Sequence, residues 1–377
     1  MWWGHREHGG HLVTAAPATH LFVPRFEPGA VGNHVIEARD ALVAAGHRSE
    51  IFAGDVDPAW AGRGARHYDD YGRAVPAGRD DRLVYQVAIG SPVADWLVDR
   101  SETLIANHHN FTPMRFLQAW DPAATHGVAW GRRQLQRLAG RCALGIADSR
   151  FNEIDLEAAG FAETVVVPVL VDLAALEREV DEVLLARLRD AKGDGGHDWL
   201  FVGRIAPNKC QHDLVAALAA HRRAYGSRAR LHLVGASTSP AYSFALERFV
   251  AALELEGAVE ITGPVSPGQL GAYYRTADVL VCVSEHEGFC VPLLEAMHHA
   301  VPVVAYGAGA IVETVGDGGL VLDRKDPETV AVAVERVLAD ETVRSSLVAA
   351  GRARCAQLDP AKARAAFVAA VEHAGAP

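Results

Sequence analysis

The chain has 377 residues, with 36 basic and 47 acidic side chains and a formal net charge of −11. Half of its residues are hydrophobic and 22% are charged, which is the composition of a folded protein rather than a disordered one. The length predicts two or three domains. The net acidity argues against a nucleic-acid partner, because such binding needs a basic surface, although a local basic cleft could still hold a small anion.

The sequence contains no pattern typical of membrane insertion or export. Its longest apolar runs, residues 165–171 and 300–312, are short or interrupted by proline and glycine, whereas a spanning helix needs ~18 apolar residues. Residues 1–11 contain no apolar core ahead of a cleavage site, so we predict a cytoplasmic protein. The five cysteines form no C-x-x-C pair and are expected to be reduced and mostly structural.

Residues 20–170 alternate between short β-type runs and helical segments, which predicts an α/β domain with a doubly wound parallel sheet. Residues 1–19 precede this series as an N-terminal extension. The first helix is expected at Asn33–Ala45, where Gly46 can end it in a left-handed conformation. The expected strands are His20–Val23, Ser49–Ala53, Leu83–Val87, Thr103–Asn107, Ala143–Ala147 and Thr164–Val167.

A second alternating series over residues 199–358 predicts another Rossmann-like domain. Residues 171–198, charged and rich in glycine near their end, are expected to be a linker region. Residues 359–377 are expected to form a C-terminal helix that packs back on the N-terminal domain. Two such domains face each other across a cleft, where ligands bind at the carboxyl ends of the strands. The expected strands are Leu200–Val202, Arg230–Val234, Val259–Thr262, Val279–Val283, Val301–Tyr306 and Leu320–Leu322.

A loop flanked by two carboxylates carries the strongest functional signal. It runs from Glu287 to Glu295, after the strand that ends near Ser284, and leads into a helix that Pro292 can start. Carboxylates accept hydrogen bonds from hydroxyls, so this pair can hold two polyol groups such as a sugar and a ribose. The alternative is that both are solvated acids without a ligand.

A second segment combines a strand end, a glycine turn and two cations ahead of a helix. In Gly203 to Lys209, Arg204 can form paired hydrogen bonds with phosphate oxygens, Lys209 supplies a point charge, and the helix start adds partial positive charge. Together these features predict an anion site suited to a diphosphate.

With both segments in this order, the sequence resembles the retaining, nucleotide-sugar-dependent glycosyltransferases of family four, which have the GT-B fold. The resemblance covers nearly all of the chain after residue 19 and rests on the E-x7-E signature and on Gly203 to Lys209. It implies an enzyme that needs no metal or other cofactor. It also implies that Arg204 and Lys209 bind the donor diphosphate, that catalytic Glu287 acts on the transferred sugar together with Gly288, Phe289, Cys290 and Val291, and that Glu295 binds the ribose.

The N-terminal half supplies two further candidates. His108 and His109 directly follow an expected strand, and the resemblance favours His109 as the active-site histidine, although the register between the two is open. The Phe26 to Asn33 loop matches the glycine-containing first loop of the family but lacks its adjacent glycines, which leaves Gly32 as the candidate for diphosphate contact.

Three other patterns have simpler interpretations. Gly307 and Gly309 lack the full dinucleotide fingerprint, so turn geometry explains them better than NAD binding. His5, His8 and His11 lie in a glycine-rich extension without a ligand framework. Arg133, Arg137 and Arg141 form a basic helix face that could contact an anionic membrane, but a solvated face over a buried stripe is the simpler interpretation.

The sequence therefore predicts a retaining transferase that moves a hexose, with mannose as one candidate, from a nucleoside diphosphate sugar to a hydroxyl of a glycan or glycolipid precursor. Peripheral contact with the inner face of a membrane would suit a lipid-linked acceptor. The alternatives are a GT-B-fold sugar-nucleotide epimerase, a non-catalytic bilobal sugar-binding protein and, less well supported, an NAD-dependent dehydrogenase.

Overall fold

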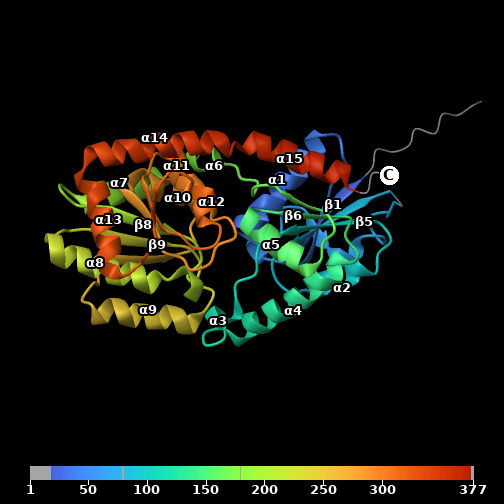
Figure 1. The fold of residues 1–377 in the computed structure, drawn as a ribbon, viewed down its shortest axis with the longest axis horizontal. Helices are drawn as coiled ribbons and strands as arrows, with labels where there is room; N and C mark the ends of the chain where they lie inside the picture. Colours follow the sequence, from blue (N-terminus) through green and yellow to red (C-terminus); the bar gives the residue numbers. More distant parts are fainter. Residues whose placement is uncertain (1–17, 79, 179, 375–377) are drawn as a thin grey trace, which may run out of the picture.

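Two parallel sheets, each in its own lobe, form the framework of the computed structural model (Figure 1). The structure describes residues 18–78, 80–178 and 180–374. His5, His8 and His11, with most of the predicted extension, lie outside the described residues. No helix among those described is long and apolar enough to cross a membrane.

The N-terminal sheet contains seven strands in the order β3-β2-β1-β4-β5-β6-β7. The sequence predicted six of them and missed β3, a three-residue edge strand whose arginine and histidine give no apolar signal. Its elements are β1 (Thr19–Phe26), α1 (Ala30–Ala44), β2 (Ile51–Val56), β3 (Ala65–His67), β4 (Arg82–Val87), α2 (Pro92–Val98), β5 (Thr103–His108), α3 (Met114–Leu117), α4 (Pro122–Ala139), β6 (Leu144–Ala147), α5 (Arg150–Ala159) and β7 (Thr164–Val166).

The C-terminal sheet contains six strands in the order β10-β9-β8-β11-β12-β13. Ser266 begins one of its helices with the capping box that the sequence indicated. Its elements are α6 (Ala175–Arg178), α7 (Glu182–Lys192), β8 (Asp198–Val202), α8 (Gln211–Tyr225), β9 (Arg230–Val234), α9 (Pro240–Ala252), β10 (Val259–Gly263), α10 (Pro267–Thr276), β11 (Val279–Cys282), α11 (Val291–His298), β12 (Val303–Tyr306), α12 (Ile311–Val315), β13 (Leu320–Leu322), α13 (Pro327–Ala339) and α14 (Glu341–Gln357).

Each sheet reverses its strand order once, and this reversal fixes where a ligand can bind. In the N-terminal sheet the chain turns back between β1 and β4, and in the C-terminal sheet between β8 and β11. In open α/β sheets the crevice at the carboxyl ends of such strands is the usual ligand site. The segment containing Arg204 follows β8 and the segment containing Glu287 follows β11, so the topology brings both predicted segments to one crevice.

The expectation that residues 171–198 form a linker is wrong for most of that range. Helix α7 buries Leu184, Leu185 and Leu188 in the same apolar cluster as β11 and α11. The charged residues that suggested a linker lie on the outer face of an amphipathic helix. The C-terminal domain therefore starts before residue 199, and α7 is part of it.

The last helix, α15 (Pro360–His373), returns to the N-terminal lobe after α14 has crossed the C-terminal one (Figure 1). Its Phe367 is fully buried in the cluster that contains Val35 and Leu42 of α1. The guanidinium of Arg364 donates to the carboxylate of Glu37 with an Nε to Oε2 distance of 2.9 Å. The chain thus crosses between the lobes twice.

A buried charge cluster closes the amino-terminal end of the C-terminal sheet. Asp198 is fully buried and accepts from Nε and Nη2 of Arg230, both at 2.8 Å. The ring of His232 lies between Asp198, at 3.2 Å, and Glu260, at 2.8 Å. Burial lowers the pKa of His232, but the bonds to these two carboxylates outweigh burial and leave it raised.

This cluster predicts a loss of stability on mild alkalinisation. Because the pKa of His232 is higher in the folded chain, its contribution is fully present below the unfolded value of about 6.5 and is lost as the pH rises through the folded value. We expect His232→Gln to flatten the fall in unfolding free energy between about pH 6 and pH 8, measured by urea denaturation. The matched variant is His126→Gln, at an exposed position. An equal fall in both variants would contradict this prediction.

Candidate active site

A short ion pair joins the two loops that follow β8 and β11. Lys209 Nζ lies 2.6 Å from Glu287 Oε2, and the two side chains are only 15% and 8% exposed. The sequence indicated each residue separately, with Lys209 on a phosphate and Glu287 on a sugar. The structure adds that they bind each other, so Glu287 is neither a solvated acid nor an isolated buried charge.

Arg204 lies in the same segment after β8 as Lys209, but it has no such partner in the described part of the chain. Its side chain is exposed, and among the described residues it has no recorded hydrogen bond or ion pair. Its backbone carbonyl accepts from Nε2 of Gln211, which fixes the turn that presents it. Because the backbone of Arg204 is fixed and its guanidinium has no recorded partner among the described residues, the guanidinium can bind an incoming anion.

The backbone between Glu287 and α11 offers further donors. Within the part of the chain that the structure describes, the amides of Gly288, Phe289, Cys290 and Val291 have no recorded hydrogen-bond acceptor. Cys290 has a left-handed φ of 70° and is the N-cap of α11, so the chain turns sharply here. Free N–H groups at a helix start favour negative or strongly polar ligand atoms.

Glu295 lies deeper than the sequence suggested. It is the fifth residue of α11 rather than a residue of the first turn, and its side chain is half-buried. The hydroxyl of Tyr274 donates to its Oε2 at 2.7 Å. Burial raises the pKa of Glu295, and the bond from Tyr274 only partly opposes this. The second oxygen has no recorded partner among the described residues.

A glycine-containing loop after β12 holds Glu287 from the other side. The amide of Ala310 donates to the carbonyl of Glu287 at 2.9 Å. Gly309 has a φ of 59°, and a Cβ there would lie 2.5 Å from the same carbonyl oxygen. The sequence indicated turn geometry at Gly307 and Gly309 without revealing that this turn positions a site carboxylate.

His109 lies at the carboxyl end of β5, but its ring is enclosed. Nδ1 lies 2.7 Å from Asp148 Oδ2, Nε2 lies 2.6 Å from Gln86 Oε1, and the side chain is 3% exposed. The amide nitrogen of Gln86 has no partner among the described residues, whereas Asp148 also accepts from Asn107. We therefore infer that Asp148 fixes the orientation of the His109 ring, and that a ligand could replace Gln86 as the partner of Nε2.

His108 faces the interior instead. Its side chain is fully buried against Phe111, and Nε2 lies 3.4 Å from Asp155. That hydrogen bond outweighs burial and lowers the pKa of Asp155. Of the two neighbouring histidines, His109 is the one that belongs to the polar network at the sheet edge.

Sequence reasoning missed the rest of this network. The ring of His34 packs on that of His109 with centroids 4.8 Å apart, accepts from the amide of Leu170 at Nδ1, and bonds Asn107 through Nε2. Burial, with His109 next to it, lowers the pKa of His34 to about 3, so His34 is neutral. Asp148 could have been found, because it directly follows β6 as His109 follows β5.

Gly32 lies inside α1 rather than in the preceding loop. A Cβ there would meet the carbonyl oxygen of Glu27 at 2.0 Å and the ring of Trp60 at 2.7 Å, so close packing requires glycine at this position. Gly29, with a φ of 143° and open space beside it, is the residue that turns the chain into the helix. The diphosphate contact of Gly32 remains a prediction.

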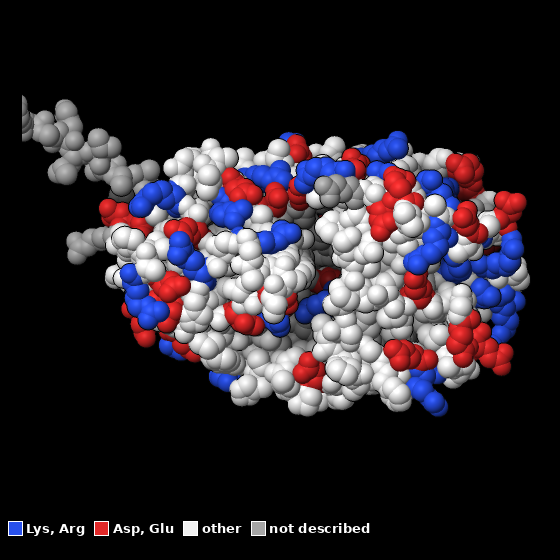
Figure 2. Space-filling view, turned by 180° about the vertical axis from the view of Figure 1, so that it is seen from behind, with Lys and Arg blue, Asp and Glu red and all other residues white. Residues whose placement is uncertain are grey.

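Figure 2 shows a hollow between the two lobes, in which both basic and acidic side chains are visible. Several hydrogen bonds connect the lobes. Both oxygens of Glu313, on α12, accept from the first two amides of α5, each at 2.8 Å. His286 Nε2 bonds Asn110 Oδ1 at 3.0 Å, and Ser149 Oγ donates to the carbonyl of Gly288 at 2.7 Å. A Cβ on Gly288 would meet Asn110 at 2.6 Å. Glycine at this position therefore permits the closed arrangement.

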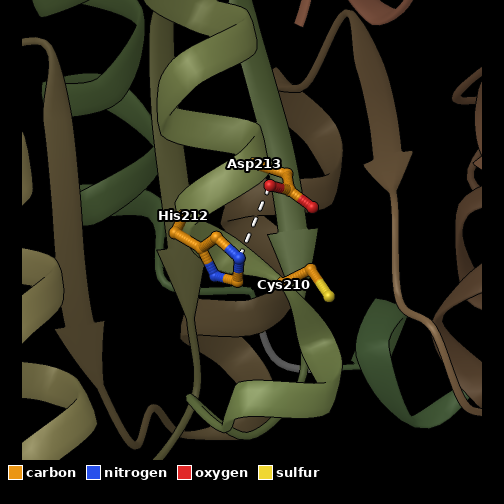
Figure 3. A group of neighbouring side chains, drawn as sticks. All are labelled: Cys210, His212 and Asp213. Carbon is orange, nitrogen blue, oxygen red and sulfur yellow. Dashed lines mark ion pairs between the residues drawn. The ribbon is translucent and has the colours of Figure 1, made fainter. Parts of the chain in front are cut away.

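Three potential metal ligands follow Lys209 in the chain, but two of them already interact with other side chains of the protein. Figure 3 shows the ion pair between His212 and Asp213 with the sulfur of Cys210 beside them. Asp213 also binds Lys325, and Nδ1 of His212 lies 2.9 Å from the hydroxyl of Tyr242. Burial raises the pKa of Cys210 to about 11, which disfavours the thiolate that metals bind. This group does not support a metal centre.

Arg133 and Arg137 lie on α4, whereas Arg141 lies in the turn after the helix, and two of these three arginines make contacts inside the lobe. Arg137 pairs with Asp95, and Arg141 donates to the backbone carbonyls of Arg100 and Glu102. Arg133 is exposed. The contacts of Arg137 and Arg141 favour the solvated, structural interpretation, and membrane contact remains a prediction from the sequence.

Two Rossmann-like lobes with a polar site between the carboxyl ends of their sheets define the GT-B architecture. Solved structures share it along nearly the whole chain. The Anabaena protein HepE, in complex with UDP and glucose, has a TM-score of 0.75 at 19% identity and covers 94% of this chain and 99% of its own. Sucrose-phosphate synthase from Thermosynechococcus elongatus has a TM-score of 0.73 at 20% identity, covering 93% and 96%. The predicted fold class is confirmed.

Sequence comparison finds a family model that matches most of the C-terminal domain. Residues 189–354 match the model described as glycosyl transferases group 1. A D-inositol 3-phosphate glycosyltransferase from Kineococcus radiotolerans is 33% identical over 246 residues, which cover 61% of this chain and 56% of the relative. An O-antigen chain mannosyltransferase B from Escherichia coli is 36% identical over 102 residues, 27% of each chain. The chain spans about half the length, or less, of these curated relatives.

The buried ion pair predicts unequal effects for the two cations. Lys209→Ala leaves Glu287 buried without its partner, and we expect a loss of ~3 kcal/mol or more in unfolding free energy. Arg204→Ala removes an exposed side chain without a recorded partner and should change stability by less than about 0.5 kcal/mol. Thermal and urea unfolding without ligand measure both. Equal losses would show that the Lys209 to Glu287 pair has no special role.

The turn at Gly309 predicts a defect specific to the site. Gly309→Ala must adopt a left-handed conformation and also displace the backbone of Glu287. Gly257→Ala is the matched control, since Gly257 has a φ of 79° but open space beside it. We expect about 1 kcal/mol of destabilisation in the control, and a larger loss in Gly309→Ala together with weaker ligand binding by calorimetry. Indistinguishable variants would remove Gly309 from the support of the site.

Proposed function

We propose that this chain is a retaining hexosyltransferase that uses a nucleoside diphosphate sugar and a hydroxyl acceptor from a glycan or glycolipid precursor. The observation that carries the proposal is the set of free amides from Gly288 to Val291 beside exposed Arg204. Together with Lys209, they concentrate hydrogen-bond donors and positive charge in one crevice at the ends of β8 and β11. A diphosphate leaving group needs such preorganised stabilisation.

We assign the other parts of the donor, its ribose and its transferred sugar, to different residues around the diphosphate. The unpaired oxygen of Glu295 is suited to ribose hydroxyls, and Glu287 with the amides next to it to hydroxyls of the transferred sugar. His109 would contact that sugar from the other lobe after its Nε2 exchanges Gln86 for the ligand. Gly32 lies at the start of α1, where the positive helix end would add to the field at the diphosphate.

The state of Glu287 bears on the mechanism. Its carboxylate is bonded to Lys209 and mostly buried, which disfavours the free approach that an enzymic nucleophile needs. Retention is then best explained by attack of the acceptor on the face from which the diphosphate departs, with a donor phosphate oxygen taking the acceptor proton. The protein acts through positioning and charge stabilisation, and we expect no metal to be needed.

The relatives narrow the candidates for the substrates. The similar proteins are named as an inositol phosphate glycosyltransferase and a mannosyltransferase, and the similar structure HepE was solved with UDP and glucose. Mannose and glucose from GDP or UDP donors are therefore the first to test. The N-terminal lobe would hold the acceptor, because its sheet edge faces the donor site across the hollow.

The test separates transfer from the two alternatives. The protein is incubated with GDP-mannose or UDP-glucose, with and without a panel of sugar and inositol phosphate acceptors, and the nucleotide and sugar products are measured. A transferase releases the nucleoside diphosphate in proportion to glycosylated acceptor. An epimerase converts the donor without any acceptor, and a binding protein releases no nucleotide. Activity should persist in EDTA, and its restoration only by magnesium or manganese would contradict the metal-free account.

Two variants connect the activity to the site. Arg204→Ala should lower kcat/KM about 100-fold or more, as for loss of one preorganised donor. Glu295→Gln should weaken donor binding in calorimetry, and wild-type affinity should fall on acidification above the usual glutamate range, because the pKa of Glu295 is raised. Glu328→Gln, exposed on α13, is the control. Unchanged donor affinity in Glu295→Gln would remove this residue from the ribose site.

A further inference from the structure

Two cysteines lie directly beneath the proposed donor site. Cys282 ends β11, and Cys290 is the N-cap of α11, so the intervening segment carries Glu287. Their sulfurs are 3.8 Å apart, and both lie within 4.8 Å of a carboxylate oxygen of Glu287. Cys282 is 3% exposed, whereas Cys290 is only partly buried. The other three cysteines are not in this cluster.

The local hydrogen bonds make this pair chemically distinct. Cys290 Sγ and Cys282 Sγ are within hydrogen-bond distance of each other, and Ser284 Oγ lies 3.5 Å from the Cys282 sulfur. The bond from Cys290 lowers the pKa of Cys282 although burial opposes it, and the pKa of Cys290 is raised correspondingly. Of the two sulfurs, this hydrogen bond favours Cys282 as the one that becomes a thiolate. Burial raises the pKa of Cys142 to about 12 and of Cys355 to about 11, so those thiols stay protonated.

We propose that Cys282 and Cys290 are an oxidation site, at which a two-electron oxidant such as hydrogen peroxide forms a disulfide that switches off donor binding. The effect on donor binding rests on the function proposed above. Formation of the bond does not, because it depends only on the two sulfurs and the oxidant.

The chemistry balances in two steps. The Cys282 thiolate attacks one oxygen of hydrogen peroxide, the O–O bond breaks, and sulfenic acid and hydroxide form. The Cys290 sulfur then attacks the sulfenic sulfur, the S–S bond forms, and the hydroxyl leaves as water with the Cys290 proton. Two thiols are oxidised and one peroxide is reduced to two waters. A thiol reductant reverses the reaction by exchange.

Geometry links this bond to the donor site. A disulfide has an S–S distance of about 2.05 Å, so the sulfurs must approach each other by nearly half of their present separation. The segment between them is held near its middle, by Lys209 on Glu287 and by Asn110 on His286. Drawing Cys290 toward β11 displaces the free amides at the start of α11, which are the donors assigned to the sugar and diphosphate.

The sequence permits a clean measurement of the bond. The full chain is treated with hydrogen peroxide, alkylated and analysed by mass. Trypsin releases Cys282 and Cys290 in one fragment, residues 276–324, and cleavage after Glu285 and Glu287 separates them. A disulfide keeps the two pieces joined until a reductant is added. We expect this linkage, with the other cysteines still alkylated.

Donor affinity is then measured by calorimetry before oxidation, after it, and after reduction. We expect at least a ten-fold loss on oxidation that dithiothreitol restores. Cys282→Ser should bind donor normally and be insensitive to peroxide, whereas Cys355→Ser, which removes an unpaired thiol, should remain as sensitive as the wild type.

The outcomes separate the two proposals. Linkage of Cys282 to Cys290 in a chain that binds no nucleotide sugar supports the oxidation site and contradicts the proposed function. Normal donor binding without the linkage, or equal peroxide sensitivity in Cys282→Ser, overturns the oxidation site. Linkage with unchanged donor affinity overturns the switch.

Discussion

The contact between Lys209 and Glu287 sets the geometry on which the site depends. Each residue lies in a segment that follows a strand at the reversal point of the C-terminal sheet, and their pairing joins those two segments below the surface. A carboxylate buried to this degree needs a cation, and a cation this close to a carboxylate is partly neutralised. The two cations therefore have different roles. Lys209 pairs with Glu287 and fixes its position, whereas the guanidinium of exposed Arg204 is available to a ligand.

The loop between β11 and α11, which carries Glu287, also contacts the N-terminal lobe. Gly288, next to Glu287, has its carbonyl bonded to Ser149, and its missing side chain leaves room for Asn110. The carboxylate of Glu313 meanwhile satisfies the first amides of α5, where the helix dipole favours negative charge. Polar contacts between partly exposed groups each contribute little free energy, so we expect only a modest free-energy difference between this closed arrangement and an open one. A ligand with groups for both lobes can therefore shift that equilibrium.

Much of the framework could be predicted from the sequence, because strands of a parallel sheet are continuous apolar runs and helix caps use recognisable residues. Arg204, Lys209 and Glu287 could be found because they lie in the segments that connect such strands to the next helix. The enclosure of His109 could not be predicted, because it depends on Gln86 of β4 and on Asp148 after β6, and register across a sheet is not local information. Helix α7 was mistaken for a linker because its polar face dominates its composition, while Leu184 and Leu188 carry the packing.

Electrostatics explains why the site suits a diphosphate better than a neutral ligand. The pair of Lys209 and Glu287 contributes little net charge, so Arg204 and the oriented amides of α11 determine the field at the mouth of the crevice. Amide dipoles fixed by the backbone need no reorganisation when negative charge develops on a leaving group, whereas water would. Because these amides are fixed by the backbone, a change in the residues that support the turn before α11 also changes their orientation. Cys282 and Cys290 support the turn that aims those amides, so a change in their bonding reaches the ligand without any direct contact with it.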